Sequence, residues 1–163
     1  MEQLKKSGLT NAIGVSNFNT QLLSDMLTYC DVKPAVCQTA LFPKRAQTDL
    51  LRFLNDHGVQ PCGYSPVGRP NDERGSANII DDSLILGLAE KYGRSPVQIV
   101  LNWGLCRGYP IIPLSSQLKN QKANMEVVNF QLDSEEVQAI TDKFDCNQLL
   151  FQAPEECDYN LFA

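Results

Sequence analysis

Short apolar runs alternate along the whole chain with longer segments in which apolar residues recur at helical spacing. The short runs lie at residues 12–15, 36–38, 59–64 and 111–113. Each is followed by at least one helical pattern, and this alternation is typical of βαβ units on a parallel sheet. The pattern therefore predicts an α/β protein with four strands, each followed by a helix.

The helical segments are bounded by residues that begin or end helices. Gly8, Gly58 and Gly93 follow three of them, as expected for C-terminal caps. Ser95 is followed by Pro96, a favoured pair of cap residue and first helical residue. Helices are predicted over residues 2–7, from 19, 46–57, 83–92, from 95, from 115 and from 133.

Size and charge narrow the class of protein. With 163 residues, the chain fits one domain over residues 1–163, whereas a complete eight-stranded βα barrel needs about 250. The formal net charge is −5 without any basic cluster, so neither nucleic acid nor an anionic membrane is an expected partner. No apolar run approaches the roughly 18 residues of a membrane span, and the charged start does not resemble a signal peptide. We therefore expect a cytoplasmic protein.

The six cysteines are far apart, with no C-x-x-C pair. A disulfide framework or a zinc site is the alternative to unpaired cytosolic thiols, and the spacing favours the thiols. No metal site is predicted. Trp103 lies among apolar residues at helical spacing and is expected in the core.

Polar side chains follow each predicted strand, where parallel βα folds bind ligands. They are Ser16 and Asn17, Gln38, Tyr64 and Ser65, and Ser115. Asn, Gln and Ser offer both donors and acceptors to an amide, Tyr can stack on a flat heterocycle, and the amides of residues 66–68 can cradle a pyrophosphate. The alternatives are that Ser16 and Asn17 cap a helix, that Gln38 bonds to the backbone, and that Tyr64 is an ordinary half-buried aromatic.

Several motifs, in order and spacing, resemble the aldo-keto reductases over essentially the whole chain. They are Gly14-Val15-Ser16-Asn17-Phe18, Lys33-Pro34-Ala35-Val36-Cys37-Gln38, Tyr64-Ser65-Pro66-Val67-Gly68, Gln98-Ile99-Val100-Leu101-Asn102-Trp103 and Ile112-Pro113. The resemblance implies a partial (β/α)8 TIM barrel, made of roughly the last four βα units and a C-terminal tail. It also implies NAD(P)H-dependent reduction of small aldehydes and ketones.

The same resemblance implies roles for eight residues in binding a nicotinamide dinucleotide. They are Ser16, Asn17 and Gln38 on the carboxamide, Tyr64 on the nicotinamide ring, Ser65 and Val67 along the pyrophosphate, and Ser115 and Asn124 as phosphate and adenine contacts. Phe151, Tyr159 and Phe162 of the tail either close a substrate pocket, as the family's C-terminal loop does, or only cover the barrel.

Two departures from the family pattern stand out. The Lys and Arg that clamp the 2′-phosphate of NADP are replaced by Leu114 and Asn120, although Lys119 and Lys122 lie nearby in sequence, so both NADP and NAD remain open. The family's catalytic Asp, Tyr, Lys and His come from the first four units, and nothing here matches them. The only histidine, His57, is expected to cap a helix or face solvent.

No catalytic residue is therefore predicted, and the chain alone is expected to be inactive. One alternative is a non-catalytic nucleotide-binding or protein-interaction half-barrel. Another is a half-barrel that associates with itself or with a separate first half through its exposed sheet.

Overall fold

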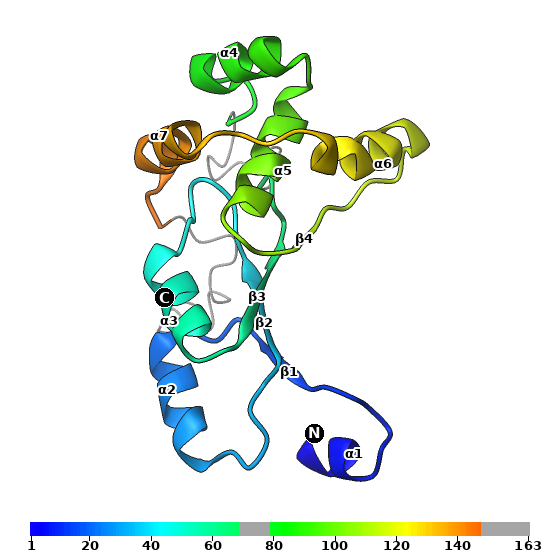
Figure 1. Cartoon of the computed structure of the whole chain (residues 1–163), viewed down its shortest axis with the longest axis vertical. Helices are drawn as coiled ribbons and strands as arrows, with labels where there is room; N and C mark the ends of the chain where they lie inside the picture. Colours follow the sequence, from blue (N-terminus) through cyan, green and yellow to red (C-terminus); the bar gives the residue numbers. More distant parts are fainter. Residues whose placement is uncertain (69–78, 148–163) are drawn as a thin grey trace, which may run out of the picture. The chain divides into compact units, whose positions relative to one another are not determined.

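The computed structural model describes residues 1–68 and 79–147 (Figure 1). Its strands form one parallel sheet in the order β1-β2-β3-β4, which confirms the α/β class and the expectation of a partial (β/α)8 barrel. The strands are β1 Gly14–Ser16, β2 Val36–Ala40, β3 Gln60–Tyr64 and β4 Ile111–Ile112. The helices are α1 Glu2–Lys6, α2 Thr20–Tyr29, α3 Thr48–Asp56, α4 Ser83–Tyr92, α5 Pro96–Cys106, α6 Leu118–Met125, the 3-10 helix η1 Glu126–Asn129 and α7 Ser134–Phe144.

The chain divides into two compact units. The first unit contains Met1–Thr39 and Gln47–Cys62, and the second contains Ala40–Ala46 and the described residues from Gly63 onward. In the part of the chain that the structure describes, no helix is long and apolar enough to cross a membrane.

In the first unit, α2 and α3 pack on one face of the β1–β2 pair (Figure 1). Its buried core consists of Leu23, Cys37, Leu50, Leu54 and Val59. Val15 packs against this core and is the register partner of Cys37. Because side chains alternate along a strand, the neighbouring pair Ser16 and Gln38 belongs to the opposite face of the sheet.

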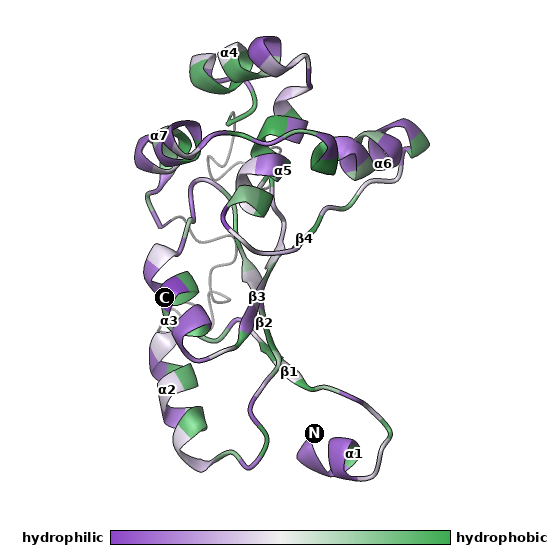
Figure 2. Ribbon diagram, viewed as in Figure 1, coloured by the Kyte–Doolittle hydropathy of each residue, from purple (hydrophilic) through white to green (hydrophobic). Residues whose placement is uncertain are grey.

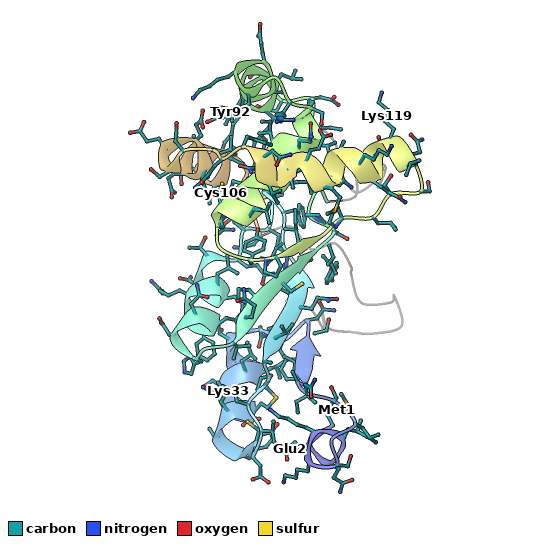
Figure 3. All side chains as sticks on the ribbon, turned by 45° about the vertical axis from the view of Figure 1, so that its right-hand side comes forward. Met1, Glu2, Lys33, Tyr92, Cys106 and Lys119 are labelled. Carbon is teal, nitrogen blue, oxygen red and sulfur yellow. The ribbon has the colours of Figure 1, made fainter. Side chains whose placement is uncertain are left out.

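Helix α1 buries no residue, and Figure 2 shows it mostly in the colour of hydrophilic residues. Two polar contacts hold it to the loop after α2. The carboxylate of Glu2 accepts a hydrogen bond from the Val32 amide at 3.0 Å, and Lys6 pairs with Asp31 at 2.9 Å. Figure 3 labels Glu2 together with Lys33 of this loop.

The second unit is built around α5, whose residues Gln98–Gly104 are all buried. Trp103 is fully buried, as predicted, and its indole N–H donates to the Thr141 hydroxyl of α7 at 3.0 Å. The helix begins with a capping box between Ser95 and Gln98, so the predicted start at Ser95 and Pro96 is confirmed.

A polar network joins α4 to the start of α7. The Glu136 carboxylate accepts hydrogen bonds from the Lys91 ammonium and the Tyr92 hydroxyl, each at 2.6 Å, and from the Asp133 amide at 3.0 Å. Asp133 in turn caps α7 by accepting from the Glu136 amide at 2.9 Å. Tyr92 therefore belongs to a structural contact between helices (Figure 3).

Two predicted helix starts are wrong by a few residues. The helix expected from 46 begins at Thr48, because Gln47 has a left-handed φ of +47° and its side chain donates to the Thr39 hydroxyl at 3.2 Å. The helix expected from 115 begins at Leu118, because the Ser115 hydroxyl accepts from the Gln117 amide in a local turn.

Candidate functional site

The end of β1 and the middle of β2 bring three predicted site residues together in the first unit, because β2 continues past Gln38 to Ala40. Ser16 and Gln38 are register partners, and the Asn17 amide donates to the Gln38 carbonyl at 2.9 Å. Ser16 and Asn17 are exposed, and Gln38 is half-buried. One hydroxyl and two carboxamide side chains thus lie on adjacent strands or directly after one of them, on segments fixed by backbone hydrogen bonds.

Asn17 adopts a left-handed φ of +58°, a region that few residues other than glycine enter and that asparagine tolerates. Helix α2 is capped by Asn19, whose side chain accepts from the Leu22 amide at 2.9 Å. The alternative that Ser16 and Asn17 are the helix cap is therefore wrong. The chain turns sharply at Asn17, between the strand and its helix.

In the second unit, Tyr64 is the last residue of β3 and packs half-buried against the apolar core. Val67 packs half-buried against the same core, and Ser65 is also half-buried. Ser65 also has a left-handed φ, of +47°. The Gly68 amide donates to the Ser65 carbonyl at 2.8 Å and closes a tight turn. Gly68 itself has φ +72°, and a Cβ there would lie 3.2 Å from the Phe42 ring.

This turn refines the predicted pyrophosphate cradle. Proline carries no amide hydrogen, and the Gly68 amide is already bonded to Ser65. The expectation that the amides of residues 66–68 all face an anion is therefore wrong for Pro66 and Gly68. Ser65 and Val67 are the positions at which this turn can offer an amide to a phosphate.

The segment after β4 carries the remaining predicted contacts. Leu114 is 98 % exposed, so an aliphatic chain projects into solvent where a cation was expected from the resemblance. Ser115 is half-buried, and its carbonyl accepts from the Gln121 side chain at 2.8 Å.

Helix α6 presents Asn120 and Asn124 one turn apart, so they share a face. Lys119 and Lys122 are exposed and lie one and two positions from Asn120. Residues so spaced do not face the same way on a helix, and Figure 3 shows Lys119 projecting outward from α6. Neither lysine occupies the face of Asn120.

His57 is the C-cap residue of α3, in agreement with the predicted helix-capping position. Its ring stacks on Phe53 with 4.1 Å between ring centroids, and Nδ1 lies 2.8 Å from the Phe53 carbonyl oxygen. Cys30, Cys37, Cys62, Cys106 and Cys146 carry free thiols. Over residues 1–68 and 79–147, no group of three or more His, Cys, Asp or Glu could hold a metal ion. The predictions on Phe151, Tyr159 and Phe162 lie outside the described residues.

A carbonyl reductase needs a proton donor whose pKa is tuned towards neutrality. The pKa values of two tyrosines of the second unit are shifted in the opposite direction, away from neutrality. The hydrogen bond to Glu136 raises the pKa of Tyr92, and burial raises the pKa of Tyr109. Neither hydroxyl is suited to donate a proton at neutral pH.

Comparison with known proteins gives consistent results. The model of the aldo/keto reductase family matches residues 1–145. The chain is 39% identical over 143 residues to the NADP-dependent D-sorbitol-6-phosphate dehydrogenase of Malus domestica, covering 86% of this chain and 46% of that protein. It is 38% identical over 143 residues to aldo-keto reductase family 1 member A1 of Xenopus tropicalis, covering 86% and 44%.

Among solved structures, an aldo-keto reductase of Bombyx mori in complex with NADP matches with a TM-score of 0.90 at 29% identity, covering 99% of this chain and 53% of that one. The chain spans about half the length of the curated relatives it matches.

Proposed function

Because this chain belongs to the aldo/keto reductase family, we propose that it binds a nicotinamide dinucleotide and provides cofactor contacts of an NAD(P)H-dependent reductase of aldehydes and ketones. The observation that carries the proposal is the pairing of Ser16 with Gln38 and the backbone bond from Asn17 to Gln38. It sets three amide-binding side chains beside one another, at the end of β1 and on the neighbouring β2.

The chemistry of this donor set fits a carboxamide. A carboxamide has one acceptor oxygen and two N–H donors, and Asn17, Gln38 and Ser16 offer groups of both kinds. When bound, the nicotinamide supplies a hydride to the carbonyl carbon of the substrate. The role proposed for these residues is to bind the carboxamide and fix the orientation of its ring.

In the second unit we assign the ring face to Tyr64 and the pyrophosphate to Ser65 and Val67. The core behind Tyr64 limits its motion, which favours stacking on one face of a flat heterocycle. Ser115 and Asn124 are the proposed contacts to the adenosine phosphate and adenine.

Proton donation is not assigned to any residue of this chain. The Nδ1 atom of His57 contacts the Phe53 carbonyl at the end of α3, and the pKa values of Tyr92 and Tyr109 are raised. We therefore propose that these 163 residues alone bind the nucleotide without reducing a carbonyl. Turnover then requires an acid from elsewhere, such as a further segment or a separate chain.

For the cofactor, we propose that this chain does not favour NADPH over NADH. A 2′-phosphate dianion is held best by a bidentate guanidinium together with an ammonium. The exposed Leu114 and Asn120 supply neither, and Lys119 and Lys122 lie on other faces of α6. The Malus relative is NADP-dependent by name, so this chain would differ from it in that respect.

A second candidate is a non-catalytic half-barrel that associates with itself. It is favoured by the sheet order, in which β1 and β4 are the outer strands of the described part and pair only with β2 and β3 respectively. Open parallel edges are a template for pairing with another chain. Light scattering on the purified chain distinguishes a monomer from a defined oligomer.

The test of the main proposal is a fluorescence titration of the purified chain with NADPH and NADH, after sizing. We expect saturable binding of both, with Tyr64→Ala weakening it about tenfold because one stacked ring is lost. The matched control is Tyr29→Ala, a 68 % exposed tyrosine of α2, which should leave affinity unchanged. Absence of binding by a folded, monodisperse sample would refute the proposal, and equal loss in both variants would refute the role of Tyr64.

A further inference from the structure

The turn of residues 65–68 contains two left-handed residues within four positions. Ser65 has φ +47° and Gly68 has φ +72°. The hydrogen bond from the Gly68 amide to the Ser65 carbonyl, 2.8 Å long, closes the turn from within. A left-handed φ is unfavourable for a serine, so such a backbone persists only where the surrounding structure holds it. The contacts that surround this turn therefore decide its shape.

The ring of Phe42 makes the closest of these contacts at Gly68. A Cβ built on Gly68 would lie 3.2 Å from Cδ2 of Phe42, 3.4 Å from Cε2 and 3.8 Å from Cγ, and these are the three nearest atoms outside the adjacent residues. A side chain at this position would have to displace the ring or the turn. Glycine thus lets the backbone of the turn lie directly against the face of an aromatic side chain.

The ring of Phe42 is itself held in place. Phe42 is fully buried and belongs to the main core of the second unit. The Arg45 amide donates to the Phe42 carbonyl at 2.8 Å, and the Phe42 amide donates back to the Arg45 carbonyl at 3.4 Å. The Leu41 amide donates to the carbonyl of Tyr64, the residue before the turn, at 3.3 Å. Because side chains in a close-packed core move little, the ring is a fixed surface beneath the turn.

We propose that Phe42 is a positioning residue for the dinucleotide: its ring holds residues 65–68 in the shape that presents the Ser65 and Val67 amides to the pyrophosphate. The inference rests on the proposed function, which assigns the pyrophosphate to this turn. Amides that are ordered before the anion arrives bind it more tightly, because less conformational entropy is lost on binding. Phe42 acts through the turn and need not contact the nucleotide.

The first test is a titration of Phe42→Leu with NADPH, at a temperature at which circular dichroism shows the variant to be folded. Leucine keeps an apolar side chain and removes the flat ring, and Phe42→Met takes its place if Phe42→Leu does not fold. We expect NADPH affinity to fall about tenfold, because the turn must then be ordered by the ligand.

The matched control is Ile140→Ala, which truncates a fully buried residue of α7 in the same core. Both variants should have a lower melting temperature, but only Phe42→Leu should lose NADPH affinity. An equal loss of affinity in the two variants would mean that a general loosening of the core is responsible, and would overturn the inference. Unchanged affinity in Phe42→Leu would overturn it as well.

A double-mutant cycle with Gly68→Ala tests the contact itself. Gly68→Ala should weaken NADPH binding about tenfold in wild type but only about threefold in the Phe42→Leu background, because both changes disturb one contact. Effects that simply multiply would mean that the two residues act independently, and would contradict the proposal. Failure of wild type to bind NADPH counts against the proposed function, whereas wild-type binding that does not depend on Phe42 counts against this inference alone.

Discussion

Asn102 of α5 is the polar residue on which the order of the second unit most depends. It is only 2 % exposed, and its side chain contacts the segment that joins α6 to α7. The Nδ2 group donates to the carbonyls of Val127 and Phe130, each at 2.8 Å, and Oδ1 accepts from the Leu132 amide at 2.9 Å. One side chain thus satisfies three backbone groups far along the chain.

Replacing Asn102 with alanine removes all three bonds. Each contributes about 1 kcal/mol net, and a buried amide left without a partner costs a further 1–3 kcal/mol or so. Alanine is the better helix former, which offsets roughly 0.6 kcal/mol. We therefore expect the free energy of unfolding to fall by about 3–5 kcal/mol, a large share of the roughly 5–15 kcal/mol of a typical domain.

The assay is urea unfolding followed by the fluorescence of Trp103, the only tryptophan of the chain and the neighbour of Asn102. The matched control is Asn120→Ala, an exposed asparagine on α6, for which we expect a change within about 0.5 kcal/mol. A loss below about 1 kcal/mol for Asn102→Ala would show that water or a local shift replaces its bonds. The view of Asn102 as the organiser of this segment would then be abandoned.

Three further predictions concern the sheet, the cofactor and pH. Gly14→Ala should lower the free energy of unfolding by about 1–3 kcal/mol and weaken NADPH binding, because a Cβ would lie 2.7 Å from a carbonyl oxygen of β2. The control Gly87→Ala, with open space around it, should do neither, and equal melting temperatures and NADPH affinities for the two variants would contradict this prediction. Leu114→Lys with Asn120→Arg should raise the ratio of NADPH to NADH affinity, and an unchanged ratio in fluorescence titration means that the register assigned to this segment is wrong. Partial burial opposes ionisation of Glu136, but hydrogen bonds from the lysine and tyrosine of α4 and from the cap of α7 hold its pKa below the usual value. Its contribution to stability is therefore fully present above the unfolded pKa of about 4.3 and is lost as pH falls through the lower folded pKa. Glu136→Gln should therefore flatten the acid limb of a plot of melting temperature against pH, and a parallel curve would contradict the assignment.

Some features could be predicted from sequence because their causes are local. The cap at Ser95 and the helix over 83–92 follow from side chains that bond to their own backbone within a turn. The four strands follow from short apolar runs that alternate with helical patterns, and the observed order is the one in which consecutive βα units lie side by side. The motif around Ser16 and Asn17 also indicated the site, although it left the helix-cap alternative open until Asn19 proved to be the cap.

Other features depend on partners that sequence reasoning did not locate. The structural role of Asn102 depends on backbone groups about 25 to 30 residues away. The closed turn from Phe42 to Arg45 was not singled out from the sequence, because the contacts that hold it come from Asp145 and Arg107, far along the chain.

The sequence by itself determined the class of fold, the presence of four strands, most helix starts and the residue types offered near the strand ends, because hydrophobic spacing and capping act over a few residues. Only the tertiary structure decided which of those residues meet. The register of β1 against β2 and the left-handed turn at Asn17 arise from long-range hydrogen bonds and packing. The energies of such contacts depend on distance in space and not on separation along the chain, so no local pattern encodes them.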